Sequence, residues 1–488
     1  MYRKNISEYL ASLGIFLILF VLYHSWLKPT YLTKPPAEPA AASSAHKDPI
    51  PTPPDAEHQP ILPDTLVEQR QLQRIVPSGE PPANRHAEAL KAIQEELEKH
   101  NIGSALSGLQ ALPPDAITDP KARQYIAGLW NNLGIQQERV SGTAHALKAY
   151  QTAAGLDPAS MTARLNLAHA YWEQRDPRLT QDFLSKLIAM APDESFPHLA
   201  MADYLQERDR LTEAAKHLEQ ASERARKDPN LKSYLESVTA KVKRTATVEQ
   251  KFTSHATTHF IVKYDGEEDQ MTWMAVLDIL EDAYREISQK LDYFPTKPIY
   301  VVLHTKDSFR GATGSPAWAD GLYDPVLGRI QIPTQGALTD KSWLTRVLRH
   351  EFVHALLSQR MGSEVGTLPT WLNEGLAMQL AGDPWPDIDQ MLQGANAGEV
   401  KLIPLNHLES GWARFSGGMA TIAYLEGNSA THYIIDRFGM HAVQEILAAL
   451  KTRKTIGGAI QDKLFMPYDQ FQRQWVDTLN AKLGAATG

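Results

Sequence analysis

The 488-residue sequence contains no cysteine. It therefore has no disulfide, no thiolate metal ligand, no cysteine nucleophile and no cysteine for lipid attachment. It also has no excess of positive charge, because 49 lysine and arginine residues stand against 57 aspartate and glutamate residues, a formal net charge of −8. With neither a basic field nor a basic run to contact a phosphate backbone, nucleic acid is not an expected partner.

Long apolar runs are also scarce, and the one at residues 10–27, "LASLGIFLILFVLYHSWL", follows Arg3 and Lys4. About 18 mostly apolar residues are just enough to cross a bilayer. The run predicts a transmembrane signal anchor after a short cytoplasmic N-terminus at residues 1–9, with the bulk of the chain exported. The alternative is a cleaved secretory signal, but the small-residue site near "PAAASSA" lies far beyond the apolar core.

Proline is concentrated in one stretch, residues 28–84, among alanine, serine and charged residues, as in "KPPAEPAAASSAHKDPIPTPP". Such a composition cannot bury a hydrophobic core. We expect this stretch to be a linker.

Residues 85–248 show internal similarity. One unit has the spacing of a 34-residue repeat in Trp130, Leu133, Gly134, Ala146, Tyr150, Ala153 and Pro158. The next unit contains Leu167, Ala168, Tyr171 and Pro192, the last of which lies 34 residues after Pro158. This spacing is typical of tetratricopeptide repeats, which stack pairs of antiparallel helices. The pattern predicts an all-α solenoid that either binds a partner protein or peptide or acts as a spacer.

The segment "RVLRHEFVHALLSQ" places three polar residues in an otherwise apolar helix. At 100° per residue, His350, Glu351 and His354 share one side, while apolar residues occupy most of the remaining circumference. A buried carboxylate and two buried imidazoles need compensation, and a bound cation supplies it. The H-E-x-x-H spacing predicts zinc on His350 and His354, with Glu351 acting on a water molecule.

A second predicted helix, "LPTWLNEGLAMQL", carries Glu374, 20 positions after His354. This distance lets the chain turn and return with Glu374 facing the same metal. Two histidines and a glutamate form a three-ligand zinc site whose fourth position is open. Asn373 and Trp371 are expected to hold the second helix against the first.

These motifs carry a resemblance. "HEFVH" followed by "WLNEGLA" resembles the gluzincin metallopeptidases, and residues 249–488 are similar to the bacterial peptidase MA-like domain. The resemblance implies that "AYLEGNSATHYI" supplies a catalytic tyrosine, Tyr424; a tyrosine that only packs is the alternative. The amine-binding glutamate of related aminopeptidases is missing from Gly321–Pro333, which favours an endopeptidase.

The predicted fold class is therefore multidomain: an N-terminal transmembrane helix, a tetratricopeptide-type solenoid, and an α+β zincin domain of the thermolysin-like kind, whose sheet has its edge strand near Arg329–Pro333. The predicted function is that of a zinc peptidase in the bacterial cell envelope, anchored in the inner membrane with its bulk in the periplasm. Its substrate would be a peptide or protein. The alternative is a repeat-based scaffold with an inactive or structural metal domain.

Two further histidines, His255 and His259, share the four-residue spacing, but they lie in a β-like stretch without an intervening carboxylate. We do not expect them to bind metal.

Overall fold

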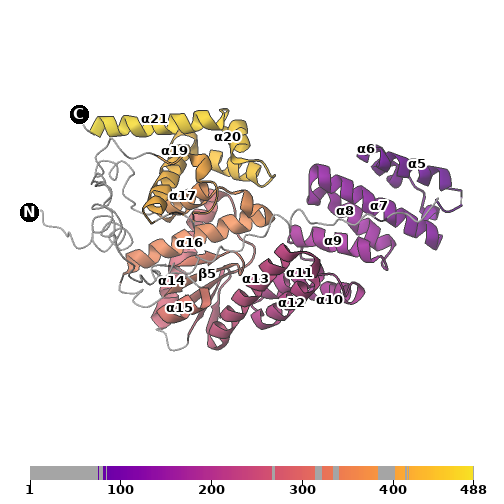
Figure 1. Cartoon of the computed structure of the whole chain (residues 1–488), viewed down its shortest axis with the longest axis horizontal. Helices are drawn as coiled ribbons and strands as arrows, with labels where there is room; N and C mark the ends of the chain where they lie inside the picture. Colours follow the sequence, from indigo (N-terminus) through magenta and orange to yellow (C-terminus); the bar gives the residue numbers. More distant parts are fainter. Residues whose placement is uncertain are drawn as a thin grey trace, which may run out of the picture. The chain divides into compact units, whose positions relative to one another are not determined.

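The structure is a computed structural model of the chain, shown in Figure 1. It describes residues 75, 81–83, 85–265, 270–313, 321–333, 340–382, 402–412, 415 and 417–486. Two compact units meet in the sequence between Ala246 and Thr247, and each is described on its own below.

The N-terminal unit consists of helices in its described part. Its elements are α5 (Ala87–Glu98), α6 (Ile102–Gln110), η2 (Pro114–Ile117), α7 (Pro120–Ser141), α8 (Thr143–Leu156), α9 (Met161–Glu173), α10 (Gln181–Met190), α11 (Phe196–Gln206), α12 (Leu211–Arg224), η3 (Ala225–Lys227) and α13 (Pro229–Val248). Helix α7 begins where the Asp119 side chain accepts a hydrogen bond from Ala122 N at 2.8 Å, and it ends at Gly142, whose φ is 84°. Acidic N-caps and glycine at a positive φ are common helix boundaries.

Helices α7 and α8 pack closely because Gly134 has no side chain. A Cβ atom on Gly134 would lie 2.6 Å from the ring of Tyr150, which is fully buried. Ala146 and Ala153 on α8 are also fully buried. Small residues thus bring the two helices together while one aromatic ring fills the space between them. The assignment of these helices to tetratricopeptide repeats stays a prediction.

The C-terminal unit contains a five-stranded sheet in the order β1-β2-β3-β5-β4. The strands are β1 (Thr253–Ala256), β2 (Phe260–Tyr264), β3 (Ile299–His304), β4 (Leu322–Asp324) and β5 (Arg329–Pro333). Strands β2, β3 and β5 are parallel, whereas β1 and β4 are antiparallel to their neighbours and form the edges. The predicted edge at Arg329–Pro333 is wrong, because β5 pairs with β3 on one side and with β4 on the other.

Helices surround this sheet and continue to the C-terminus. They are η4 (Glu249–Lys251), α14 (Gln270–Leu291), α15 (Lys306–Thr313), α16 (Lys341–Met361), η6 (Gly362–Thr367), α17 (Thr370–Ala381), η7 (Leu405–His407), α19 (Gly417–Leu450), α20 (Ile456–Leu464) and α21 (Tyr468–Ala486). On one sheet face, Ile330 and Ile332 join the apolar core that includes residues of α14 and α16. The same core extends to Trp371 of α17 and Trp475 of α21, so one hydrophobic core supports the region around α16.

The other sheet face carries a buried charged group. Arg329 of β5 bonds to both oxygens of Glu249, at 3.1 and 2.8 Å, and Lys263 of β2 lies 2.6 Å from the same carboxylate. All three side chains are buried. The first turn of the unit, η4, is thereby tied to the sheet, since removing one partner would leave a buried charge uncompensated.

The structure corrects the predicted fold class and location. Helix dominates the described residues and the sheet is small, so an α+β description of the domain is wrong. In the described ranges, no helix is both long enough and apolar enough to cross a membrane; α14, for example, is 22 residues long but carries Glu281, Asp282 and Arg285. The anchor predicted at residues 10–27 lies outside the described residues, and the single-pass inner-membrane location is not supported.

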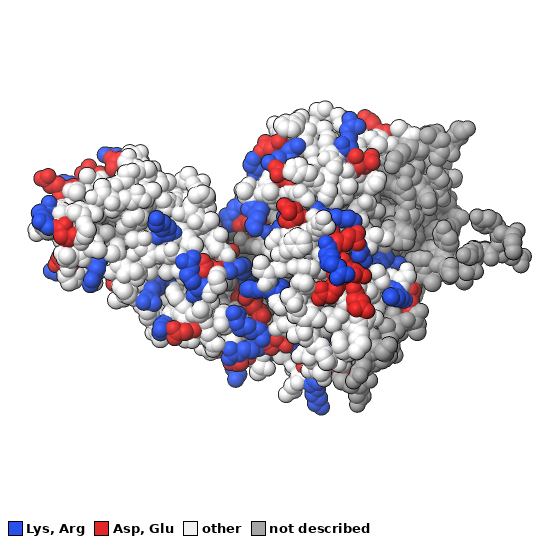
Figure 2. All heavy atoms as spheres, turned by 180° about the vertical axis from the view of Figure 1, so that it is seen from behind, with Lys and Arg blue, Asp and Glu red and all other residues white. Residues whose placement is uncertain are grey.

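Charged side chains of both signs lie next to one another over the face drawn in Figure 2. Among the described residues, Lys186 pairs with Asp182 within α10, and Arg210 pairs with Glu213 at the start of α12. Exposed pairs of this kind contribute little to stability.

Candidate metal centre

Helix α16 supplies three of the predicted site residues. It begins where Asp340 accepts a hydrogen bond from Trp343 N, and it ends at Gly362, whose φ is 61°. Leu344, Leu348, Phe352 and Leu356 are fully buried, which confirms the expectation of a helix enclosed on most sides. The polar stripe on this otherwise largely buried helix contains His350, Glu351 and His354.

Helix α17 runs back along α16 and brings Glu374 to this stripe. Arg349 fixes the arrangement: its Nε donates to Ala381 O at 3.0 Å and its NH2 to Leu380 O at 3.1 Å. Arg349 thus binds carbonyls at the C-terminal end of α17, where a cation is favourable. The same guanidinium lies 2.7 Å from Glu286 of α14. The residue beside His350 therefore connects three helices.

The three predicted ligands converge on one point. His350 Nε2 and His354 Nε2 lie 3.1 Å apart, and Glu374 Oε2 is 3.5 Å from the first and 3.4 Å from the second. Ligand atoms held about 2.0–2.1 Å from a tetrahedral zinc ion lie about 3.3 Å from one another. The observed triangle fits that geometry. A metal ion could be held by His350, His354 and Glu374, whose ligand atoms all lie within 4.8 Å of one another. No other group of three or more histidine or acidic side chains among the described residues lies as close together.

Asn373 orients one of these ligands. Its Oδ1 lies 3.1 Å from His354 Nδ1, so that nitrogen donates and Nε2 is left to face the other two ligands. A hydrogen bond of this type selects the tautomer that binds metal. Burial alone would lower the pKa of His354, but Glu374, Glu351 and Asn373 raise it to about 9. Burial would likewise raise the pKa of Glu374, but His354 and His350 hold it well below its usual range.

Glu351 is held by an edge strand rather than by the other site residues. Its Oε2 accepts a hydrogen bond from Tyr323 N of β4 at 2.6 Å. Only one carboxylate oxygen is used in this bond, and the side chain is 9% exposed. The carboxylate lies close enough to His354 to help raise the pKa of that histidine.

Tyr424 reaches the site because α17 and α19 approach without side chains between them. A Cβ atom on Gly375 would lie 2.3 Å from Gly427 O, and one on Gly427 would lie 2.7 Å from Trp371 O. Glycine at both positions permits this contact between helix backbones. It places Tyr424, one turn before Gly427, near the residue that precedes Gly375, which is Glu374.

The electrostatics of Tyr424 agree with this placement. Glu374, burial and Glu351 together raise the pKa of its hydroxyl well above the ordinary value, because an anionic tyrosine beside two carboxylates is unfavourable. The hydroxyl therefore stays protonated and able to donate. Trp412 packs edge-on against its ring, with the centroids 4.9 Å apart.

Residues 288–481 match the Peptidase MA superfamily. The match supports a peptidase MA-like domain in this part of the chain. The match includes all five predicted site residues and indicates a peptidase-like, metal-dependent function. None of the curated proteins compared with the chain matches it.

Two features of the peptidase MA-like domain were not predicted from the sequence. The bond from Tyr323 to Glu351 uses a main-chain N–H, which every residue except proline has. No residue type in the sequence therefore indicates this bond. The packing of Trp412 on Tyr424 joins a loop to α19, and only the tertiary structure shows it.

His255 and His259 have other partners. His255 Nε2 lies 2.9 Å from the Tyr264 hydroxyl, and its ring stacks on Trp273 at 4.3 Å. His259 Nδ1 lies 2.7 Å from Glu281 and its ring stacks on Tyr284 at 3.8 Å. Packing and hydrogen bonding account for both histidines.

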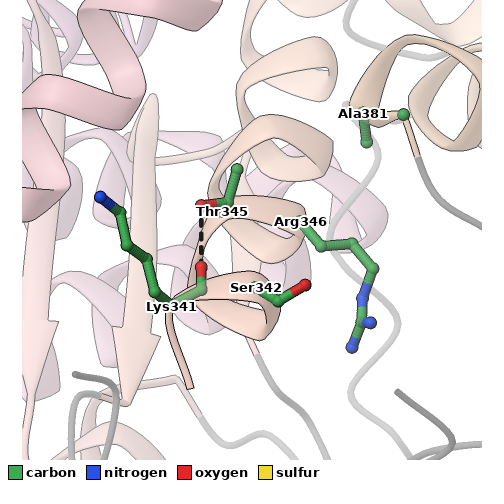
Figure 3. Close-up of a pocket in the computed structure, with 6 residues that line it drawn as sticks. Lys341, Ser342, Thr345, Arg346 and Ala381 are labelled. Atoms are coloured by element: carbon green, nitrogen blue, oxygen red, sulfur yellow. Dashed lines mark hydrogen bonds between the residues drawn. The ribbon is translucent and has the colours of Figure 1, made fainter. Parts of the chain in front are cut away.

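A cavity of about 440 Å³ adjoins the first turns of α16 (Figure 3). Its lining consists of Lys341, Ser342, Thr345, Arg346, Ala381 and Gly382. Arg346 is one helical turn before His350, but in Figure 3 the side chains of Arg346 and Lys341 point away from each other. The two cations therefore do not form a common anion site.

Proposed function

We propose that this chain is a zinc-dependent endopeptidase whose metal is held by His350, His354 and Glu374. The supporting observation is the triangle of two imidazole nitrogens and one carboxylate oxygen, with edges of 3.1, 3.4 and 3.5 Å, next to a carboxylate that is not part of it. A structural zinc site would use four protein ligands, whereas three ligands leave a position for substrate or water. When bound, zinc lowers the pKa of a water molecule toward neutrality and polarises a peptide carbonyl.

Glu351 is the proposed general base. It lies on the helix that carries both histidines but does not belong to the ligand triangle, as a proton acceptor for the attacking water requires. The bond from Tyr323 N fixes one carboxylate oxygen and leaves the other for the proton. The same carboxylate then delivers the proton to the departing amine.

Tyr424 is proposed to stabilise the oxyanion that develops on the peptide carbonyl. Its hydroxyl remains protonated over the working pH range, because Glu374, burial and Glu351 raise its pKa. A donor that is already in place when negative charge develops contributes more than one that must first reorganise. Trp412 supports the ring edge-on.

Strand β4 is the proposed docking edge for the substrate. It is an edge of the described sheet, and its Tyr323 touches the general base. An extended peptide could add to this edge as a further strand. In the described part of the β4–β5 hairpin, the carboxylate of Asp324 accepts hydrogen bonds from Val326 N at 3.0 Å and Leu327 N at 3.1 Å. The Asp324 carboxylate therefore stabilises its own turn instead of binding the free amine of a substrate. This favours an endopeptidase over an aminopeptidase.

The test uses the full chain loaded with zinc and a mixed peptide library read by mass spectrometry. Glu351→Gln should keep one zinc per chain and lose hydrolysis by about a thousandfold or more, because the base is not a ligand. The matched control is Glu445→Gln. Glu445 lies near the C-terminal end of α19, where its carboxylate pairs with Lys463 of α20, so this variant should retain full activity. If Glu351→Gln cleaves as fast as the parent, or if neither cleaves any peptide, the scaffold alternative replaces the enzyme.

A further inference from the structure

The N-terminal unit buries a row of three asparagine side chains. Asn131 and Asn132 lie on α7 and Asn166 lies on α9, and they are 0, 4 and 1% exposed. A buried amide without partners destabilises the folded state, whereas an apolar side chain of the same shape does not. Packing alone therefore gives no reason for three amides in a row.

Hydrogen bonds join the row. Asn166 Nδ2 donates to Asn131 Oδ1 at 2.8 Å, and Asn131 Nδ2 lies 3.4 Å from Asn132 Oδ1. Asn132 and Asn166 are 34 residues apart, so they occupy equivalent positions in the predicted repeat. Asn166 of α9 thus orients Asn131, and Asn131 in turn orients the amide of Asn132 on the same helix.

The amide of Asn132 bonds to the main chain of Ile75, 57 residues earlier in the sequence. Ile75 N donates to Asn132 Oδ1 at 3.1 Å, and Asn132 Nδ2 donates to Ile75 O at 2.8 Å. This is the same exchange of N–H and C=O that two opposed residues make in an antiparallel sheet. A side chain that bonds to both main-chain groups of one residue recognises an extended backbone rather than a particular side chain.

We propose that Asn132, oriented by Asn131 and Asn166, is a binding site for the main chain of an extended peptide, and that the chain's own Ile75 occupies it. Peptide segments in extended conformation then compete with Ile75 for the site. The bound residue can have almost any side chain, but it cannot be proline, which lacks the N–H group. The amides carry no charge, so binding depends only weakly on salt. The proposal does not rest on the catalytic site.

The first experiment measures the occupancy of the site by Ile75. In the full chain, hydrogen exchange followed by mass spectrometry should show a protected amide at Ile75. Asn132→Leu, which keeps the volume but removes both hydrogen bonds to Ile75, should speed this exchange at least tenfold. The matched control is Gln136→Leu on the same helix, which removes a side-chain bond to Leu97 O instead. Equal exchange at Ile75 in Asn132→Leu and the parent would overturn the proposal.

A second variant covers the outcome in which Asn132→Leu fails to fold. Ile75→Pro changes no residue of the helices and removes the N–H group that donates to Asn132 Oδ1. Ile75→Ala is its matched control, because it retains both main-chain groups. Circular dichroism and the thermal midpoint verify that these variants are folded before binding is measured.

The second experiment measures binding in trans by fluorescence anisotropy. Three labelled peptides are compared: the sequence of residues 70–80, "RQLQRIVPSGE", a shuffled version of it, and an oligoproline of the same length, the proline peptide, which has no main-chain N–H group inside the chain. Ile75→Pro should bind the first two peptides about tenfold more tightly than the parent and Ile75→Ala do, because the tethered competitor no longer occupies the site. The proline peptide should not bind. Equal binding by Ile75→Pro and the parent, or equal binding of the proline peptide, would refute the proposal.

Discussion

Metal binding to the His350–His354–Glu374 site is predicted to depend steeply on pH, because His354 holds a proton when no cation is bound. Burial opposes this proton, but Glu374, Glu351 and Asn373 raise the pKa of His354 to about 9. A cation at neutral pH must therefore displace a proton from Nε2 before that nitrogen can act as a ligand.

The size of the effect follows from the pKa. At pH 7 the histidine lies two units below its pKa of about 9, so proton competition weakens zinc binding about a hundredfold. The apparent affinity for zinc should rise about tenfold per pH unit between pH 6 and 8, because the concentration of the competing proton falls tenfold per unit. It should level off above pH 9, where His354 is already neutral.

Competition with a zinc chelator of known affinity, repeated at several pH values, measures this slope. Calorimetric titration at pH 7 in two buffers of different ionisation enthalpy measures the protons released, and we expect about one per zinc from His354. An apparent affinity that stays constant from pH 6 to 8, with no proton released, would refute the reasoning. It would mean that Glu374 does not hold a charged His354 in the metal-free site.

The remaining predictions concern α17 and α19. Tyr424→Phe should lower turnover about a hundredfold with little change in KM or zinc content, because one donor to the oxyanion is lost; a lower thermal midpoint with unchanged turnover would assign the hydroxyl to packing. Gly375→Ala should lower the free energy of unfolding in urea by roughly 2–3 kcal/mol and weaken zinc binding, because its Cβ would meet Gly427 O at 2.3 Å. The control is Gly366→Ala, which has no atom within 4 Å of the new Cβ. Equal urea midpoints for the two variants would contradict the close contact. Burial raises the pKa of Glu426 from 4.5 to about 8, so its contribution to stability is full below pH 4.5 and is lost as the pH rises through 8. Glu426→Gln should therefore raise the thermal midpoint at pH 9 but not at pH 4, and an equal shift at both pH values would rule out this titration.

The sequence predicted the ligand triangle because helix geometry fixes it. Residues four apart on one helix project together whatever surrounds them, so His350 and His354 needed no tertiary information. Glu374 required only a short turn and an antiparallel return, and the structure places it 3.4 Å from His354 Nε2. Their roles as zinc ligands, and those of Glu351 and Tyr424 in catalysis, stay predictions.

The order of the sheet was harder to predict. Strand β5 has an apolar alternation, with Ile330 and Ile332 facing the core, which is compatible with either an edge or an interior position. The three-residue β4 gives little periodicity, yet it forms the edge and contacts Glu351. Short strands that are defined by their partners are poorly visible in the sequence.

The predicted anchor shows a different limit. An apolar run of this length is compatible with a membrane span, but hydropathy alone does not determine the structure that the run adopts. The described helices owe their stability to packing around common cores and carry charges on their outer faces. The row of asparagines was not predicted from the sequence either, because asparagine is mostly an exposed residue.

The most direct measurement of the central claim is anomalous diffraction at the zinc absorption edge from crystals of the full chain grown with zinc. We predict one strong peak between His350 Nε2, His354 Nε2 and Glu374 Oε2, about 2.0–2.1 Å from each atom. The peak should be lost in the His350→Ala, His354→Ala double variant. A zinc peak elsewhere in the chain, or no peak at this triangle in the parent, would contradict the account.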